Sequence, residues 1–60
     1  MKEKVMILKV KENNNFREKK SARLFNSEEM KKFTELVSIY VLGGWEIKVE
    51  LIEMKVKKWN

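Results

Sequence analysis

The sequence predicts a small α+β domain in which two strands, one helix and a third strand follow one another, in the order ββαβ. Three patterns in the chain predict it. Residues 4–11 are rich in apolar and β-branched side chains, residues 27–42 repeat apolar residues at helical spacing, and residues 45–57 alternate apolar and polar residues. Because sixty residues suffice for one small core, we expect a single domain over residues 1–60.

The first two strands are expected to form a hairpin. A strand over about residues 4–11 carries apolar side chains on both faces, which is typical of a central strand or of a sheet whose second face is covered by another element. A loop over about residues 12–16 follows, because its asparagines tolerate left-handed turn conformations. The second strand is expected over about residues 17–25.

The helix is expected over about residues 27–42. Either Asn26 or Ser27 can cap its first turn, and Glu29 stands three residues after Asn26, which is the spacing of a capping box. The pair Gly43-Gly44 then predicts the end of the helix. The apolar stripe expected to face the core comprises Met30, Phe33, Leu36, Val37, Tyr40 and Val41.

The third strand, over about residues 45–57, changes the phase of its alternation. Apolar residues occupy odd positions from Trp45 to Leu51 and even positions from Ile52 onwards. A β-bulge near Leu51-Ile52 would return both sets to one face of the sheet. Without a bulge, the end of the strand presents apolar residues on the face opposite the helix. The sequence leaves both alternatives open.

The expected topology is a three-stranded antiparallel sheet in the strand order 2-1-3, with the helix packed on one face. This order places the most apolar strand, over residues 4–11, in the centre of the sheet.

The composition argues against catalysis and against a bound metal. The chain has no histidine, no cysteine and no aspartate, so the usual general base, the thiolate nucleophile and the usual zinc ligands are missing. We therefore expect no enzyme activity, no cofactor and no metal site. No apolar run approaches the roughly 18 residues that span a membrane, and no signal peptide is recognisable, so we expect a cytoplasmic protein.

The net charge of +5 is concentrated in the first half of the chain, around the stretch ENNNFREKKSAR at residues 12–23. A basic hairpin of this kind can lie against phosphates while its aromatic residue stacks on a base. The residues predicted to lie near nucleic acid are Phe16, Arg17, Lys19, Lys20 and Arg23. The competing interpretation, which we favour, is a solvated basic edge that keeps a strand from pairing with a neighbour.

The chain has more apolar residues than one helix can cover on one sheet. Ile39 and Leu42 fall on the helix side opposite the core stripe, and the last strand ends with further apolar residues. The residues predicted to bind a partner protein are Ile39, Leu42, Ile52, Met54 and Trp59. An alternative for Trp59 is that it folds back and seals the open end of the sheet. Self-association, as a homodimer, is an alternative use of the apolar surface.

The stretch ARLFNSEEMKKFTELVSIYVLGGWEIKVELIE resembles a pattern of very small phage-encoded proteins, in which a strand, a helix start of the form S-x-E-E or a close variant, a glycine stop and an alternating strand follow one another. The resemblance implies ββαβ architecture and a phage or prophage origin, and it implies binding to a larger host or phage protein. Recombination directionality factors of serine-integrase phages are similar in being tiny, basic and non-catalytic. They bind the integrase on DNA and switch the recombination that it favours.

These expectations lead to a hypothesis about function. The chain is expected to bind and modulate a larger, DNA-associated protein, for example as a recombination directionality factor acting on an integrase. One alternative is a low-specificity nucleic-acid-binding protein that uses the basic hairpin directly. A second alternative is an inhibitor of a host defence protein or of a host polymerase.

Overall fold

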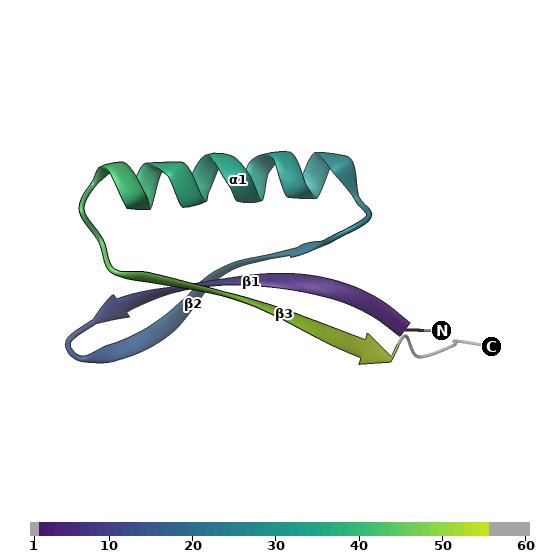
Figure 1. Cartoon of the computed structure of the whole chain (residues 1–60), viewed down its shortest axis with the longest axis horizontal. Coiled ribbons are helices and arrows are strands. Elements are labelled where there is room, and N and C mark those ends of the chain that lie inside the picture. Colours follow the sequence, from purple (N-terminus) through teal and green to yellow (C-terminus); the bar gives the residue numbers. More distant parts are fainter. Residues whose placement is uncertain (1, 56–60) are drawn as a thin grey trace.

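The computed structural model describes residues 2–55, and these residues form three strands and one helix (Figure 1). The elements are β1 (Lys2–Glu12), β2 (Asn15–Arg23), α1 (Ser27–Leu42) and β3 (Ile47–Lys55). The strands form one antiparallel sheet in the order β2-β1-β3, and α1 lies along one face of it. The predicted ββαβ order and strand order are thereby confirmed.

The β1–β2 hairpin turns on two asparagines. Asn13 and Asn14 have φ angles of 50° and 68°, which is the left-handed region that the two central residues of a type I′ hairpin turn require. Two residues are enough to reverse the chain, so β2 begins at Asn15. The loop is therefore shorter than the predicted span of residues 12–16.

The sheet contains one irregularity, and it lies in β2. Leu8 pairs with Lys20, whereas the next residue of β1, Lys9, pairs with Glu18, so that Lys19 is the extra residue of a β-bulge. The β1–β3 register, in contrast, runs without a break from Val10–Ile47 to Lys2–Lys55. Of the two alternatives left open for the last strand, the structure therefore shows the one without a bulge near Leu51-Ile52.

The ends of α1 are defined by a side-chain cap and by glycines. Asn26, not Ser27, is the N-cap: its Oδ1 accepts a hydrogen bond of 3.1 Å from the Glu29 backbone N–H. The Asn26 Nδ2 donates in turn to Glu29 Oε2 at 3.0 Å, so both side chains of the cap are held. At the other end, Gly43 is the C-cap and Gly44 has a φ of 81°.

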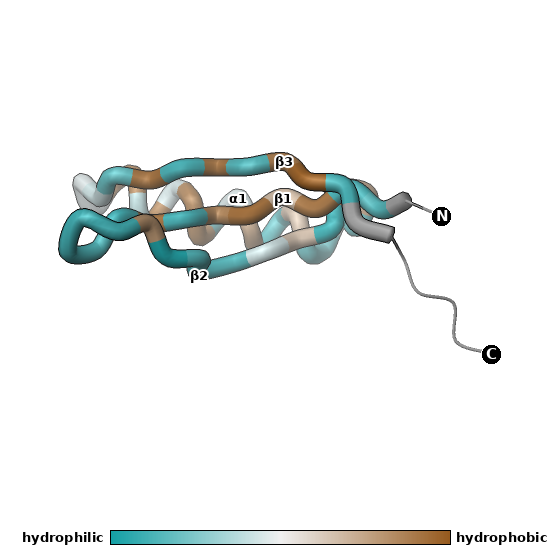
Figure 2. The backbone as a smooth tube through the Cα atoms, turned by 90° about the horizontal axis from the view of Figure 1, so that it is seen from below, coloured by the Kyte–Doolittle hydropathy of each residue, from teal (hydrophilic) through white to brown (hydrophobic). Residues whose placement is uncertain are grey.

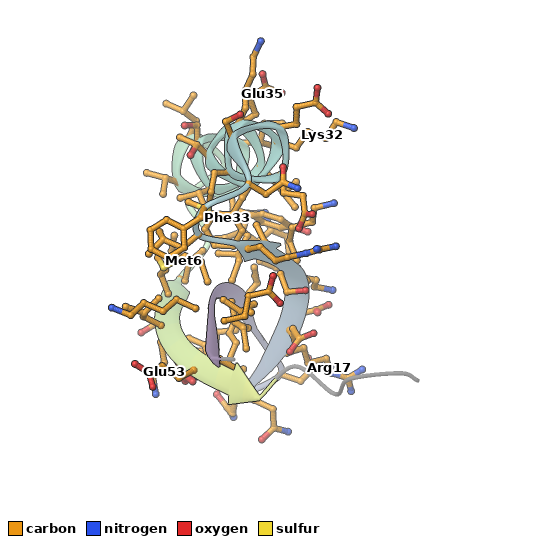
Figure 3. The ribbon with its side chains drawn as sticks, turned by 90° about the vertical axis from the view of Figure 1, so that its right-hand side faces the viewer. Met6, Arg17, Lys32, Phe33, Glu35 and Glu53 are labelled. Carbon is orange, nitrogen blue, oxygen red and sulfur yellow. The ribbon has the colours of Figure 1, made fainter. Side chains whose placement is uncertain are left out.

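The buried core lies between α1 and the β1–β2 half of the sheet. Leu8 and Val10 of β1, Ala22 of β2 and Phe33 of α1 form the cluster of buried residues. Partly buried residues surround it, namely Met6, Met30, Leu36, Val37, Tyr40 and Ile47. Figure 3 shows Phe33 and Met6 between helix and sheet, whereas Lys32 and Glu35 point away from the sheet.

The β3 side of the helix-facing sheet surface is left partly uncovered. Val49 and Leu51 stand opposite Leu8 and Met6, and therefore share their face, yet they are 41% and 54% exposed. A helix is about 10 Å wide and strands lie about 4.8 Å apart, so one helix covers about two strands. The same geometry leaves Val41 of α1 exposed, against its predicted place in the core stripe.

Candidate interaction surfaces

The described part of the chain offers no arrangement of groups for metal binding. No cluster of three or more histidine, cysteine, aspartate or glutamate side chains occurs within residues 2–55. A depression lies where β2 meets α1, and Arg23 is the one cation among the described residues that line it. The Arg23 guanidinium lies 3.3 Å from Glu29 and 3.8 Å from Glu3, so neighbouring carboxylates already balance its charge.

The cations predicted to contact nucleic acid are partly occupied by carboxylates of the same chain. The Lys19 ammonium lies 2.5 Å from Glu12 Oε1, and hydrogen bonding from Lys19 lowers the pKa of Glu12. The positive charge of Arg17 lowers the same pKa further. With Arg23 also paired, two of the four predicted cations are engaged in ion pairs within the protein.

The one aromatic residue of the hairpin, Phe16, does not share a face of the sheet with Lys20. Phe16 stands opposite Lys11 of β1, and Lys20 stands opposite Leu8. Because odd and even residues of β1 point to opposite faces, Phe16 and Lys20 lie on different sides of the sheet. The hairpin is a basic, solvated edge, and it does not gather its aromatic and cationic side chains into one binding surface.

The residues predicted to bind a partner are divided between the two sides of the molecule. Ile39 and Leu42 of α1 are exposed, at 65% and 87%, as predicted for residues outside the core stripe. Ile52 is half-buried and stands opposite Val5, on the sheet face that points away from α1. Trp59 and the side chain of Met54 lie outside the described residues. Among the described residues, Ile52 therefore does not form one continuous surface with Ile39 and Leu42.

Two further apolar residues lie at the C-terminal end of α1 beside Ile39 and Leu42. Val41 and Trp45 are each about half-exposed, at 55% and 49%. We call Ile39, Val41, Leu42 and Trp45 together the helix-end patch. Its signal in the sequence is the run IYVL at residues 39–42, which makes the last turn of the helix apolar on every side.

Trp45 is held in place at the helix end. Its ring lies edge-on to Tyr40, with ring centroids 6.0 Å apart and an angle of 83° between the planes. Its backbone N–H donates to the Tyr40 carbonyl oxygen at 3.1 Å. The tight turn at Gly43 and Gly44 brings the chain back to allow both contacts.

The sheet face opposite α1 combines a short apolar row with ion pairs, and Figure 2 looks onto it. Val5, Ile7 and Ile52 form the apolar row. Lys9 Nζ lies 3.1 Å from Glu50 Oε1, and Lys48 Nζ lies 3.4 Å from the same oxygen. Hydrogen bonding from Lys9, and then from Lys48, lowers the pKa of Glu50. We call this surface the open sheet face.

Comparison of the chain with protein-family models, with curated proteins and with solved structures yields no match. Among residues 2–55, the helix is too short and too polar to cross a membrane.

Proposed function

We propose that this chain is a small non-catalytic module that binds a larger DNA-processing protein and modulates it. The observation that carries the proposal is the helix-end patch. Four apolar side chains are exposed at one end of the domain, whereas the buried cluster within residues 2–55 has four members in all. Covering such a patch with a partner removes apolar surface from water, and tryptophan is among the residues that contribute most at interfaces.

The charge of the chain supports a partner that works on DNA. Residues 12–23 carry four cations against the two carboxylates of Glu12 and Glu18, so the hairpin stays basic despite its ion pairs. Such a field attracts a polyanion at a distance without specifying a sequence. A recombination directionality factor acting on an integrase is one function of this kind, and the proposed setting is the cytoplasm of a phage host.

The ion pairs of Lys19 and Arg23 favour this function over direct nucleic-acid binding. A side chain that contacts a phosphate must first leave its carboxylate, which offsets a modest part of the gain because both ion pairs are partly exposed to solvent. The hairpin then serves as electrostatic support near DNA, and the helix-end patch supplies the contact.

The proposal is tested with two matched variants. Leu42→Glu places a charge in the helix-end patch, whereas Phe25→Glu places the same charge at an 83% exposed site just before the helix begins. The tagged proteins are used to capture partners from nuclease-treated extract of the source cells. We expect Leu42→Glu to weaken capture of a DNA-processing partner by about 30-fold, as for a hot-spot residue, and Phe25→Glu to retain it.

Two further measurements complete the test. The partner's reaction, reconstituted from purified components, is expected to change on addition of the wild-type chain and to be unaffected by Leu42→Glu. Circular dichroism of both variants must match the wild type. If capture survives in Leu42→Glu, the helix-end patch is not the contact. If capture requires intact nucleic acid and is lost in Arg17→Glu and Lys20→Glu, the chain binds nucleic acid directly.

A further inference from the structure

The two edges of the sheet differ in how well they are protected against pairing with another strand. The edge formed by β2 carries a bulge at Lys19 and further cations at Arg17, Lys20 and Arg23. Bulges and edge cations are the usual means by which proteins prevent strand addition. The edge formed by β3 has no bulge, since its pairing with β1 is regular over nine residues. It also has no excess of one charge, since its two lysines are balanced by two glutamates.

The hydrogen-bonding groups of β3 that point away from β1 can be identified. The Lys11 N–H donates to the Glu46 carbonyl oxygen at 2.9 Å, and this pair continues the β1–β3 register by one residue. In an antiparallel ladder the bonded residues alternate, so even-numbered residues of β3 bond to β1. Ile47, Val49 and Leu51 therefore direct their backbone groups outward, where no other strand of the described chain pairs with β3.

We infer that two copies of the chain associate through β3, antiparallel and about a two-fold axis at Val49. In this register Val49 faces the Val49 of the second copy, and Ile47 faces Leu51. On the other sheet face, Lys48 stands opposite Glu50 of the second copy, and the symmetry produces this ion pair twice. Outward backbone groups meet along the whole contact, so the hydrogen-bond ladder continues from one sheet into the other.

The registers with the two-fold axis at Lys48, Glu50 or Leu51 lack this complementarity. A two-fold axis at Glu50 places the two Glu50 carboxylates opposite each other, and an axis at Lys48 does the same with two ammonium groups; like charges directly opposite are destabilising. An axis at Leu51 places Val49 opposite a glutamate and leaves Lys48 without an opposite charge. The register centred on Val49 is the one of the four that pairs apolar with apolar and acid with base.

The contact also covers the apolar side chains that α1 leaves open. Val49 and Leu51, 41% and 54% exposed, become neighbours of Val49 and Ile47 of the second copy. Lys48 keeps enough freedom to reach across, because its side chain is 59% exposed, while Glu50 retains Lys9. The inference uses β3 and not the helix-end patch, so it stands independently of the proposed function.

Cysteine cross-linking tests the register directly, since the chain has no cysteine of its own. Directly opposed residues of a hydrogen-bonded pair lie about 5.5 Å apart at Cα, which suits a disulfide. Under mild oxidation with oxidised glutathione, Val49→Cys is expected to form a disulfide-linked dimer. Leu51→Cys, at a site that is somewhat more exposed, is expected to stay monomeric, because Leu51 faces Ile47 of the second copy.

Charge-reversal substitutions at Lys48 and Glu50 test the same dimer contact without a covalent bond. Sedimentation equilibrium is expected to show the wild-type mass rising from 7.3 kDa towards twice that value as the concentration increases. Lys48→Glu and Glu50→Lys should each weaken the dimer by about tenfold, and mixing the two variants should restore it, because acidic strands then face basic ones. Lys31→Glu, an exposed helix substitution, is the control and should leave the dimer unchanged.

Several results would overturn the inference. A wild-type chain that stays monomeric up to millimolar concentration contradicts it, as does a dimer that Lys48→Glu leaves intact. Cross-linking of Leu51→Cys in preference to Val49→Cys would contradict the register. If Glu50→Lys does not fold, which circular dichroism detects, the cysteine pair and Lys48→Glu still decide the question.

Discussion

Lys9 of β1 and Glu50 of β3 form an ion pair at the centre of the open sheet face, with Nζ 3.1 Å from Oε1. Lys9 stands directly opposite Lys48, and Glu50 lies within 3.4 Å of that second lysine as well. The glutamate therefore bridges two cations that would otherwise repel each other across the two strands. Its removal affects both lysines at once.

This arrangement predicts a loss of stability in acid. The Lys9 hydrogen bond lowers the pKa of Glu50 below its ordinary value of 4.5, and the Lys19 hydrogen bond lowers the pKa of Glu12. A carboxylate with a lowered pKa in the folded state stabilises the fold above its unfolded pKa, and this contribution is lost as the pH falls through the folded value. The urea midpoint is expected to stay constant near neutrality and to fall below about pH 5.

The double variant Glu12→Gln/Glu50→Gln separates these two groups from the remaining carboxylates. It should be less stable than the wild type at neutral pH, and its urea midpoint should depend less on pH in the acid range. If the urea midpoint of the double variant falls with decreasing pH as steeply as that of the wild type, other groups are responsible for the loss of stability in acid.

Because Asn26 is the N-cap of α1, we predict that it contributes more to stability than the adjacent Ser27 does. Asn26→Ala removes the acceptor for the Glu29 N–H and the donor to the Glu29 carboxylate, so it should cost about 1 kcal/mol in the free energy of unfolding. Ser27→Ala changes the first helical residue and should cost clearly less. Urea denaturation followed by circular dichroism measures both. Equal losses would contradict the assignment of the cap to Asn26.

A substitution in the buried core at Leu8 is predicted to destabilise the fold much more than the substitution of the cap. Its side chain is fully buried, and Leu8→Ala should cost about 2–5 kcal/mol through lost burial and the cavity left behind. A domain of this size rarely has more than about 3–5 kcal/mol of stability, so the variant should lose most of its stability and unfold at a much lower temperature than the wild type. Leu42→Ala, the same substitution at an 87% exposed site, should change stability by less than about 0.5 kcal/mol. Thermal unfolding distinguishes them.

The parts of the fold that the sequence predicted depend on local patterns. The bounds of α1 follow from a cap, an apolar stripe and a glycine pair within one stretch of chain, and they coincide with the predicted residues 27–42. The strand order followed from the composition of β1. The bulge at Lys19 left no such local signal, because it is defined by which residues of β1 stand opposite those of β2.

The candidate surfaces were harder to predict for the same reason. The exposure of Ile39 and Leu42 follows from helical spacing alone and was predicted. The exposure of Val41 and Val49 depends on how far a single helix reaches across three strands. The apolar periodicity of the sequence does not predict this distance. Likewise, the engagement of Lys19 by Glu12 depends on the turn that brings the two strands together.

The two glycines after α1 predict separable effects on the helix-end patch. Gly44 has a φ of 81° and open space where a Cβ would lie, so Gly44→Ala should cost about 1 kcal/mol of stability through backbone conformation alone. Gly43 has an ordinary φ of −77°, but a Cβ there would lie 3.1 Å from Trp45 Cδ1 and 3.3 Å from the Ile39 carbonyl oxygen. In Gly43→Ala the indole must therefore move.

The Trp45 indole resonance, assigned by NMR, reports this movement. Gly43→Ala should shift it and weaken its edge-on contact with Tyr40, while Gly44→Ala should lower stability with a smaller change at the indole. Since Trp45 belongs to the helix-end patch, Gly43→Ala should also reduce capture of the partner more than Gly44→Ala does, once both are compared under conditions where they are folded. An unchanged Trp45 resonance in Gly43→Ala would mean that the backbone, and not the side chain, absorbs the added methyl group.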